Sequence, residues 1–134
     1  MGFEVYFFAL GIWFVLLVIA ILNAGLREKF FKKHMNDLKA HQLSSLIFII
    51  FIFVITFLWF KLSELVLTNL EGVLIGLFWF LLTLSFEFIA GHYLFGNSWK
   101  KLLEDYNVFK GRLWIFVLIS LFIAPFLINK SLLS

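Results

Sequence analysis

The stretch "VLIGLFWFLLTLSFEFIAGHY", residues 73–93, is long and apolar enough to cross a lipid bilayer as a helix. A membrane-spanning helix needs about 20 mostly apolar residues. Two ionisable residues, Glu87 and His92, nevertheless stand inside this stretch. A charged side chain near the bilayer centre costs about 2.5 to 3.5 kcal/mol on insertion scales. We therefore expect this helix to pack against other helices that supply polar groups facing Glu87.

Three more apolar runs flank this stretch, at residues 3–25, 43–61 and 112–129. The chain of 134 residues is 63% hydrophobic and only 14% charged, whereas soluble domains carry roughly a quarter charged residues. The composition therefore excludes a soluble globular domain and predicts an all-α fold. We expect an integral membrane four-helix bundle that forms a single domain over residues 1–134, with its third span at 73–93.

Lysine and arginine are concentrated in the segments that join the first span to the second and the third span to the fourth. The basic residues of these segments are Arg27, Lys29, Lys32, Lys33, Lys39, Lys100, Lys101, Lys110 and Arg112. Because cytoplasmic loops carry the excess of basic residues, we expect both segments in the cytoplasm and both termini outside (N-out, C-out). Basic residues beside apolar spans favour anionic headgroups, so the lipid bilayer is an expected partner and nucleic acid is not.

A short amphipathic pattern lies between the third and fourth spans, in "NSWKKLLEDYN" at residues 97–107. Trp99, Leu102, Leu103 and Tyr106 recur at helical spacing, and charged residues fill the opposite face. This pattern is typical of a helix that lies in the membrane interface. We therefore expect a short interfacial helix at about 98–107.

Two sequence features bear on how the helices pack. Gly72 and Gly76 have the GxxxG spacing that lets helices approach closely, and we treat it as weak support for association. Pro125 has no backbone N–H and should kink the fourth span near Leu121.

Polar groups from all four spans fall at one depth, near the predicted cytoplasmic ends. Arg27 closes the first span, His41 precedes the second, Glu87 and His92 lie in the third, and Arg112 opens the fourth. We interpret these five residues as a polar layer and as the candidate binding site. His92 is about 140° around the helix from Glu87 at 100° per residue, so both can line only a wide cavity.

Other interpretations of these residues stay open. Glu87 can form a buried ion pair with Arg27 or Arg112 that fixes the helix register, or both arginines can extend to lipid headgroups. His92 and Tyr93 can be a simple pair at the membrane interface.

Four segments of the chain together resemble a family of small, uncharacterised bacterial inner-membrane proteins with four helices. The segments are "GLREKF" at 25–30, "AHQLSS" at 40–45, "FEFIAGHYLFGNSWKKLLEDYN" at 86–107 and "GRLW" at 111–114. The positions that match the family pattern are Arg27, Glu28, His41, Gln42, Glu87, Gly91, His92, Tyr93, Trp99, Tyr106, Asn107, Arg112 and Trp114. The resemblance implies a multi-pass protein of the bacterial inner (plasma) membrane, and it implies no activity.

Three classes of function are compatible with the polar layer. The first is binding or transport of a small solute, a proton or a lipid headgroup, in which Arg27 and Arg112 attract an anionic group and Glu87 changes protonation. A homo-oligomer is expected to complete a transport pathway. The second is a membrane-embedded enzyme that uses His41, Glu87 and His92 to bind a metal or as acid and base. The third is an accessory subunit of a larger membrane complex.

Metal binding has only weak support in the sequence. His34, Asp37 and His41 would share one face of a continuous helix, but the neighbouring lysines repel cations, and we interpret the trio as a solvated polar face. A looser set of Glu28, His41, Glu87 and His92 is the alternative for a metal or a haem. The chain has no cysteine, which excludes thiolate ligands. We assign no metal ligand, no cofactor and no catalytic residue.

Overall fold

The computed structural model describes residues 4–94, 96–104 and 113–133, and these residues are about 90% helical, with no strand among them. The elements are α1 (Glu4–Leu26), η1 (Arg27–Phe31), α2 (Lys32–His34), α3 (Asp37–Leu62), α4 (Asn69–Ile89), η2 (Ala90–Leu94), α5 (Trp99–Glu104) and α6 (Trp114–Leu133). Four helical segments are long and apolar enough to cross a membrane. They are Glu4–His34, Asp37–Leu62, Asn69–Leu94 and Trp114–Leu132. The predicted all-α four-helix bundle is thus confirmed.

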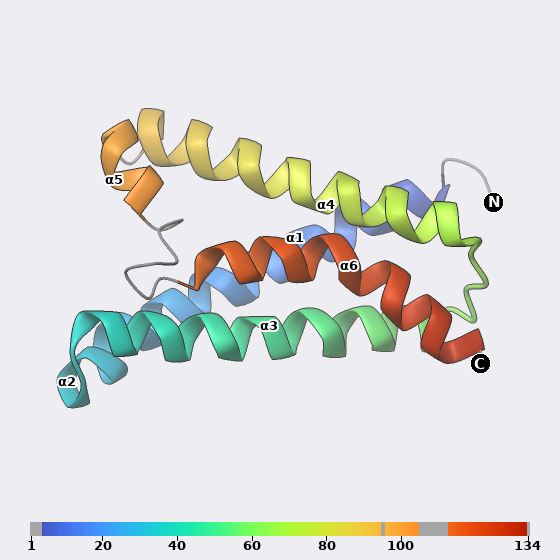
Figure 1. Ribbon diagram of the computed structural model, residues 1–134, viewed down its shortest axis with the longest axis horizontal. Helices are drawn as coiled ribbons and strands as arrows, with labels where there is room; N and C mark the ends of the chain where they lie inside the picture. The colour runs from blue at the N-terminus through green and yellow to red at the C-terminus, as the bar shows by residue number, and fades with distance from the viewer. Residues whose placement is uncertain (1–3, 95, 105–112, 134) are drawn as a thin grey trace.

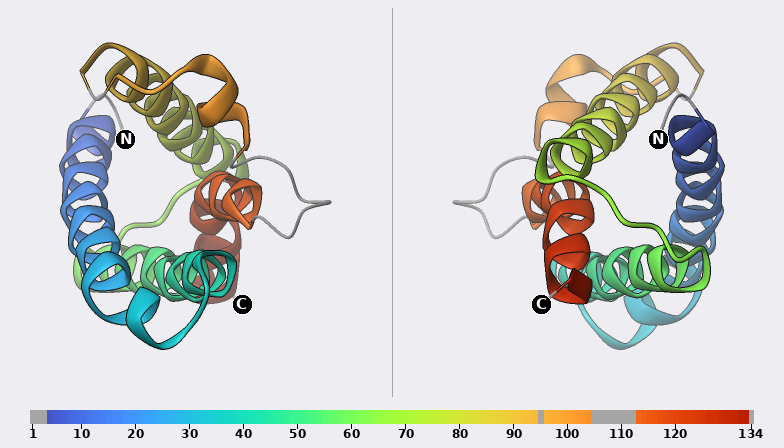
Figure 2. Two further views of the ribbon diagram at one scale, coloured as in Figure 1. Left: turned by 90° about the vertical axis from the view of Figure 1, so that its left-hand side faces the viewer. Right: turned by 90° about the vertical axis from the view of Figure 1, so that its right-hand side faces the viewer.

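The long helices surround a common axis in the order α1, α3, α6, α4 (Figure 2). Both termini lie at one end of the bundle, whereas α2 and α5 lie at the other (Figure 1). The described parts of the two basic segments therefore lie at the same end, as the N-out, C-out orientation requires. Which end faces the cytoplasm stays a prediction.

The first membrane-spanning segment is longer than residues 3–25. The π-helical turn η1 and the short α2 continue α1 without a break as far as His34. At the end of η1 the Lys32 N–H donates to the carbonyl of Arg27, five residues back. Met35 then turns to an extended conformation with φ −151° and ψ 165°, which ends the helix.

The second and third spans begin earlier than predicted, because polar capping residues extend them beyond their apolar runs. Asn36 Oδ1 accepts a hydrogen bond of 2.8 Å from the Lys39 N–H, so α3 starts at Asp37 rather than at 43. Thr68 and Glu71 form a capping box with reciprocal bonds of 3.1 and 3.0 Å, so α4 starts at Asn69 rather than at 73. Such caps satisfy the unpaired N–H groups of a first helical turn.

Glycine allows α4 to pack closely on α6. A Cβ at Gly76 would lie 1.8 Å from the Phe122 carbonyl oxygen, and one at Gly72 would lie 3.1 Å from the Phe126 Cα. The GxxxG spacing therefore serves a helix contact within the chain. The buried Pro125 lies in α6 beside this contact, and Figure 1 shows α6 bending along its length. A proline leaves the carbonyl four residues before it without its helical hydrogen bond, which permits a bend.

Two tryptophans join α1 to α4 where these helices cross. The Trp79 Nε1 donates to the Ala9 carbonyl over 2.9 Å, and the Trp13 Nε1 donates to the Thr83 hydroxyl over 3.0 Å. Thr83 in turn donates to the Trp79 carbonyl over 2.8 Å. Beyond this crossing α1 and α4 diverge toward the end that carries α2 and α5 (Figures 1 and 2).

At the opposite end, a buried asparagine fastens the connection between α3 and α4 to α6. Asn129 is only 1% exposed. Its Nδ2 donates to the Leu67 carbonyl over 2.8 Å, and its Oδ1 accepts from the Leu67 N–H at 3.3 Å. This pair of bonds replaces the sheet or helix partners that the Leu67 backbone lacks.

Candidate functional site

A pocket of about 550 Å³ lies between the four helices at the end that carries α2 and α5. Binding pockets for small molecules typically measure about 300–1,000 Å³, so this volume fits a small ligand. The pocket lies beyond the crossing of α1 and α4, where the two helices have separated. Trp13 and Thr83, which are joined at that crossing, line its inner end.

The lining changes from apolar to charged along α1. Leu16 and Ala20 line the deeper part, Asn23 follows one turn later, and Arg27 and Lys32 lie at the outer rim. The same order holds along α3, since Phe48, Ser44 and Asp37 run from the deep part to the rim. The pocket thus has an apolar base, a polar middle and a charged rim.

Hydrogen bonds between helices mark the polar middle. The Asn23 Nδ2 donates to the Ser44 carbonyl over 2.7 Å and joins α1 to α3. The Trp114 Nε1 donates to Glu87 Oε2 over 2.6 Å and joins α6 to α4. The sequence suggested Arg27 or Arg112 as the partner of Glu87. The structure shows that an indole N–H binds one oxygen of this carboxylate, and Arg112 lies outside the described residues.

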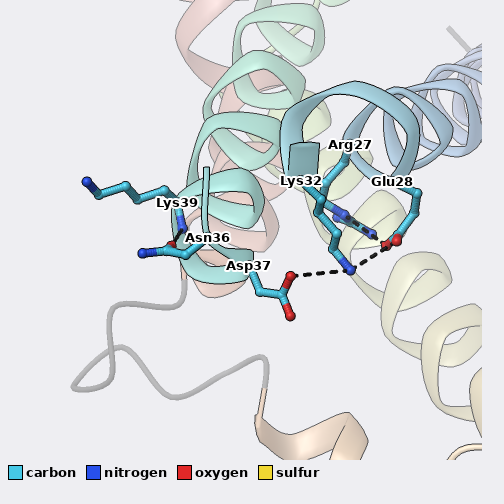
Figure 3. Close-up of polar contacts among 6 residues, drawn as sticks. All are labelled: Arg27, Glu28, Lys32, Asn36, Asp37 and Lys39. Carbon is cyan, nitrogen blue, oxygen red and sulfur yellow. Dashed lines mark hydrogen bonds and ion pairs between the residues drawn. The ribbon is translucent and has the colours of Figure 1, made fainter. Parts of the chain in front are cut away.

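A cluster of alternating charges forms one side of the rim (Figure 3). The Lys32 Nζ lies 3.0 Å from Glu28 Oε2 and 3.8 Å from Asp37 Oδ1, and the Arg27 Nε lies 3.8 Å from Glu28 Oε1. These side chains are partly exposed, and exposed ion pairs stabilise a fold by only about 0–1 kcal/mol. The cluster is therefore better suited to contact a ligand than to hold the bundle together.

Comparisons with known protein families, with curated proteins and with solved structures find no match for this chain.

The structure brings together three of the five residues predicted for the polar layer. Arg27, His41 and Glu87 all line the pocket. Arg112 lies outside the described residues. His92 is not among the described residues that line the pocket.

His92 instead contacts the segment that contains α5. Its ring stacks on Trp99 with centroids 3.8 Å apart and planes 14° apart, and its Nδ1 lies 2.9 Å from the Asn97 carbonyl oxygen. Tyr93 packs edge-on against the same histidine at 4.9 Å. The physical reason is that the chain turns back after η2 and folds over the end of α4, so His92 faces the returning segment.

The returning segment covers part of the pocket. The Asn97 N–H donates to the Gly91 carbonyl over 2.9 Å, and the buried Leu102 lies so close to Gly91 that a Cβ there would be 2.8 Å from its Cδ2. Asn97, Lys101 and Leu102 line the pocket. The predicted interfacial helix at 98–107 corresponds here to α5, Trp99–Glu104, and residues 105–107 lie outside the described part of the chain.

The described residues contain no group of three or more His, Asp or Glu side chains that could hold a metal ion. The trio His34, Asp37 and His41 required one continuous helix. Met35 and Asn36 are extended and separate α2 from α3, so that requirement is not met. The looser set is divided as well, because His92 lies outside the pocket that Glu87 and His41 line.

Proposed function

We propose that this chain is a multi-pass protein of the bacterial inner membrane that binds a small solute or a lipid headgroup in the pocket between its four helices. The main support is the order of the residues that line the pocket, which runs from the apolar base at Leu16 and Ala20 to the charged rim at Arg27 and Lys32. A ligand that enters from the cytoplasmic side meets groups that match the change from water to hydrocarbon. The resemblance to small bacterial inner-membrane proteins supports this location.

Binding is favoured over catalysis because the pocket gathers only part of the proposed catalytic set. An acid–base or metal mechanism needs its groups within hydrogen-bond or ligand distance of one substrate. His41 and Glu87 line the pocket, whereas His92 is held by Asn97 and Trp99. Binding needs no such convergence. Transport would require a homo-oligomer or a larger membrane partner, because four helices rarely enclose a whole pathway.

A fluorescent single-chain amphiphile provides the test. Trp13 and Trp114 line the pocket, so they can transfer excitation energy to a dansyl-labelled fatty acid bound beside them. We expect saturable energy transfer in the purified protein in mild detergent. Ala20→Phe fills the apolar base and should weaken binding by about tenfold or more.

Val18→Phe is the matched control, because it adds the same ring to the same helix at a side chain that is 56% exposed. It should leave the binding curve unchanged. Equal affinity in the unaltered protein and in Ala20→Phe would show that the probe does not occupy this pocket and would refute the proposal.

A further inference from the structure

We infer that the ligand of this pocket is a single-chain phospholipid whose headgroup carries both an ammonium group and a phosphate. The inference rests on the proposed function and adds the chemical class of the ligand. Four features of the pocket support it: its balance of charge, the weak contacts at its rim, an acceptor in its polar middle, and its apolar base.

Charge is balanced among the described residues that line the pocket. The cations are Arg27, Lys32 and Lys101, and the carboxylates are Glu28, Asp37 and Glu87. A ligand with a net charge would leave that charge without a partner among these described side chains. A headgroup with one positive and one negative group finds a partner for each.

Both signs of charge occur on both sides of the pocket. The α1–α3 side presents the rim cluster of Figure 3, and the α4–α5 side presents Glu87 and Lys101. Two of the rim contacts, from Arg27 to Glu28 and from Lys32 to Asp37, are 3.8 Å long. Hydrogen bonds between charged nitrogen and oxygen measure about 2.7–2.9 Å, so a phosphate or an ammonium group can replace these loose contacts with shorter ones.

A buried hydrogen-bond acceptor in the polar middle lacks a donor among the described residues. The Asn23 Nδ2 is fixed by the Ser44 carbonyl, so its Oδ1 must point elsewhere, and within the described chain this buried oxygen has no hydrogen-bond donor. Glu87 adds a carboxylate at the same depth. A single-chain phospholipid carries a free glycerol hydroxyl directly below its phosphate, which places a donor at this level.

The apolar base fits one hydrocarbon chain. Leu16, Leu17, Ala20 and Leu121 line the deep part of the pocket, and a soluble zwitterion would leave these side chains without a partner. The total volume of about 550 Å³ is that of a site for a compact ligand.

The test is displacement of the dansyl probe by purified compounds. Lysophosphatidylethanolamine should displace it at a concentration about tenfold lower than lysophosphatidylglycerol, which has a net negative charge. The soluble headgroup glycerophosphoethanolamine should not displace it. An equal or better effect of lysophosphatidylglycerol would overturn the choice of a zwitterion, and displacement by the soluble headgroup alone would overturn the choice of a lipid.

Reversal of the charge preference gives a sharper test. Glu28→Gln combined with Asp37→Asn removes two carboxylates from the rim and should shift the preference toward lysophosphatidylglycerol by about tenfold. Glu104→Gln, which removes an exposed carboxylate outside the pocket lining, should change nothing. An unchanged preference in the double variant would refute the charge-balance argument.

Two single substitutions of neighbouring lysines test the proposed contact with the phosphate. Lys101→Gln should weaken the binding of lysophosphatidylethanolamine about fivefold, whereas the neighbouring Lys100→Gln, outside the lining, should not. Native mass spectrometry measures the binding of the same lysolipids to both variants without the probe. If no compound binds in a way that Ala20→Phe weakens, the proposed function itself is refuted. Binding that keeps this sensitivity but favours another headgroup would count only against the present inference.

Discussion

Trp114 and Glu87 join α6 to α4 through one hydrogen bond of 2.6 Å, from the indole Nε1 to the carboxylate Oε2. Both residues line the pocket. The bond therefore fixes the beginning of α6 against α4 and also holds one carboxylate oxygen in place beside the cavity. The fold and the candidate site thus share this contact.

Trp114→Phe should lower the free energy of unfolding by about 1.5–3 kcal/mol, because it removes a hydrogen bond to a charged group. Unfolding in mixed micelles, followed by circular dichroism, measures the change. Glu87→Leu alone should also destabilise the protein. The two substitutions together should cost clearly less than the sum of the single costs, since they remove the same bond. Additive costs would show that the bond contributes nothing to stability.

Gly76→Ala should destabilise the bundle by about 1–3 kcal/mol, because the added methyl group meets the Phe122 backbone and α4 must move away from α6. Gly25→Ala is the control, since a Cβ there has nothing within 4 Å. An alanine is favoured over glycine inside a helix, so this control should be neutral or slightly stabilising. Similar effects of both changes would contradict the close packing of α4 on α6.

Asn129→Ala should destabilise the end of the molecule that carries the termini. It leaves the buried N–H and carbonyl of Leu67 without partners, at about 1–3 kcal/mol for each unsatisfied group. Thermal unfolding in detergent reads the loss. Asn69→Ala changes an exposed asparagine nearby and should cost much less. An equal effect of both changes would show that the bonds of Asn129 are not needed.

His92→Ala should release α5 from the end of α4, because it removes the stacking on Trp99 and the contact with the Asn97 carbonyl. Hydrogen exchange should become faster in Trp99–Glu104 and stay unchanged in the crossing of α1 and α4. His34→Ala alters an exposed histidine at the end of α2 and should leave the exchange of α5 as it was. Unchanged exchange of α5 in His92→Ala would remove this role from the histidine.

The N-out, C-out orientation can be tested by thiol labelling, since the chain has no cysteine of its own. Ser63 and Lys33 are exposed and lie at opposite ends of the bundle. In intact cells, a membrane-impermeant maleimide should label Ser63→Cys. It should label Lys33→Cys only after the membrane is opened, because basic segments stay in the cytoplasm. The opposite pattern would invert the orientation and place the pocket on the outer side.

The number of helices was predictable from the sequence, because a chain with four long apolar runs and few charges must bury its backbone groups in spanning helices. Helix starts were not predictable from hydropathy. Asn36 and the Thr68–Glu71 pair are polar residues whose side chains bond to the first turn, and they extend α3 and α4 beyond the apolar stretches. Reading the capping motifs as well would have placed both starts correctly.

The depth of the candidate site was predictable, but the tryptophan donors beside it were not. The bond from Trp114 to Glu87 was not predicted, because hydropathy counts tryptophan as bulk and ignores its N–H donor. Trp13 and Trp114 both use that donor, toward Thr83 and Glu87 respectively. The position of His92 depended on the path of the chain after η2, which no spacing within one helix can reveal.

The π-helical turns η1 (Arg27–Phe31) and η2 (Ala90–Leu94) both lie at the pocket end of the molecule. A π turn has the length of an α turn that has gained one residue. Because the extra residue is absorbed within the turn, deleting one residue from η1 would restore α geometry, remove one residue from the rim and leave the following residues in nearly the same orientation relative to α1. The makeup of the rim can therefore change by insertion and deletion of single residues, while the apolar spans below it keep their sequence and their packing.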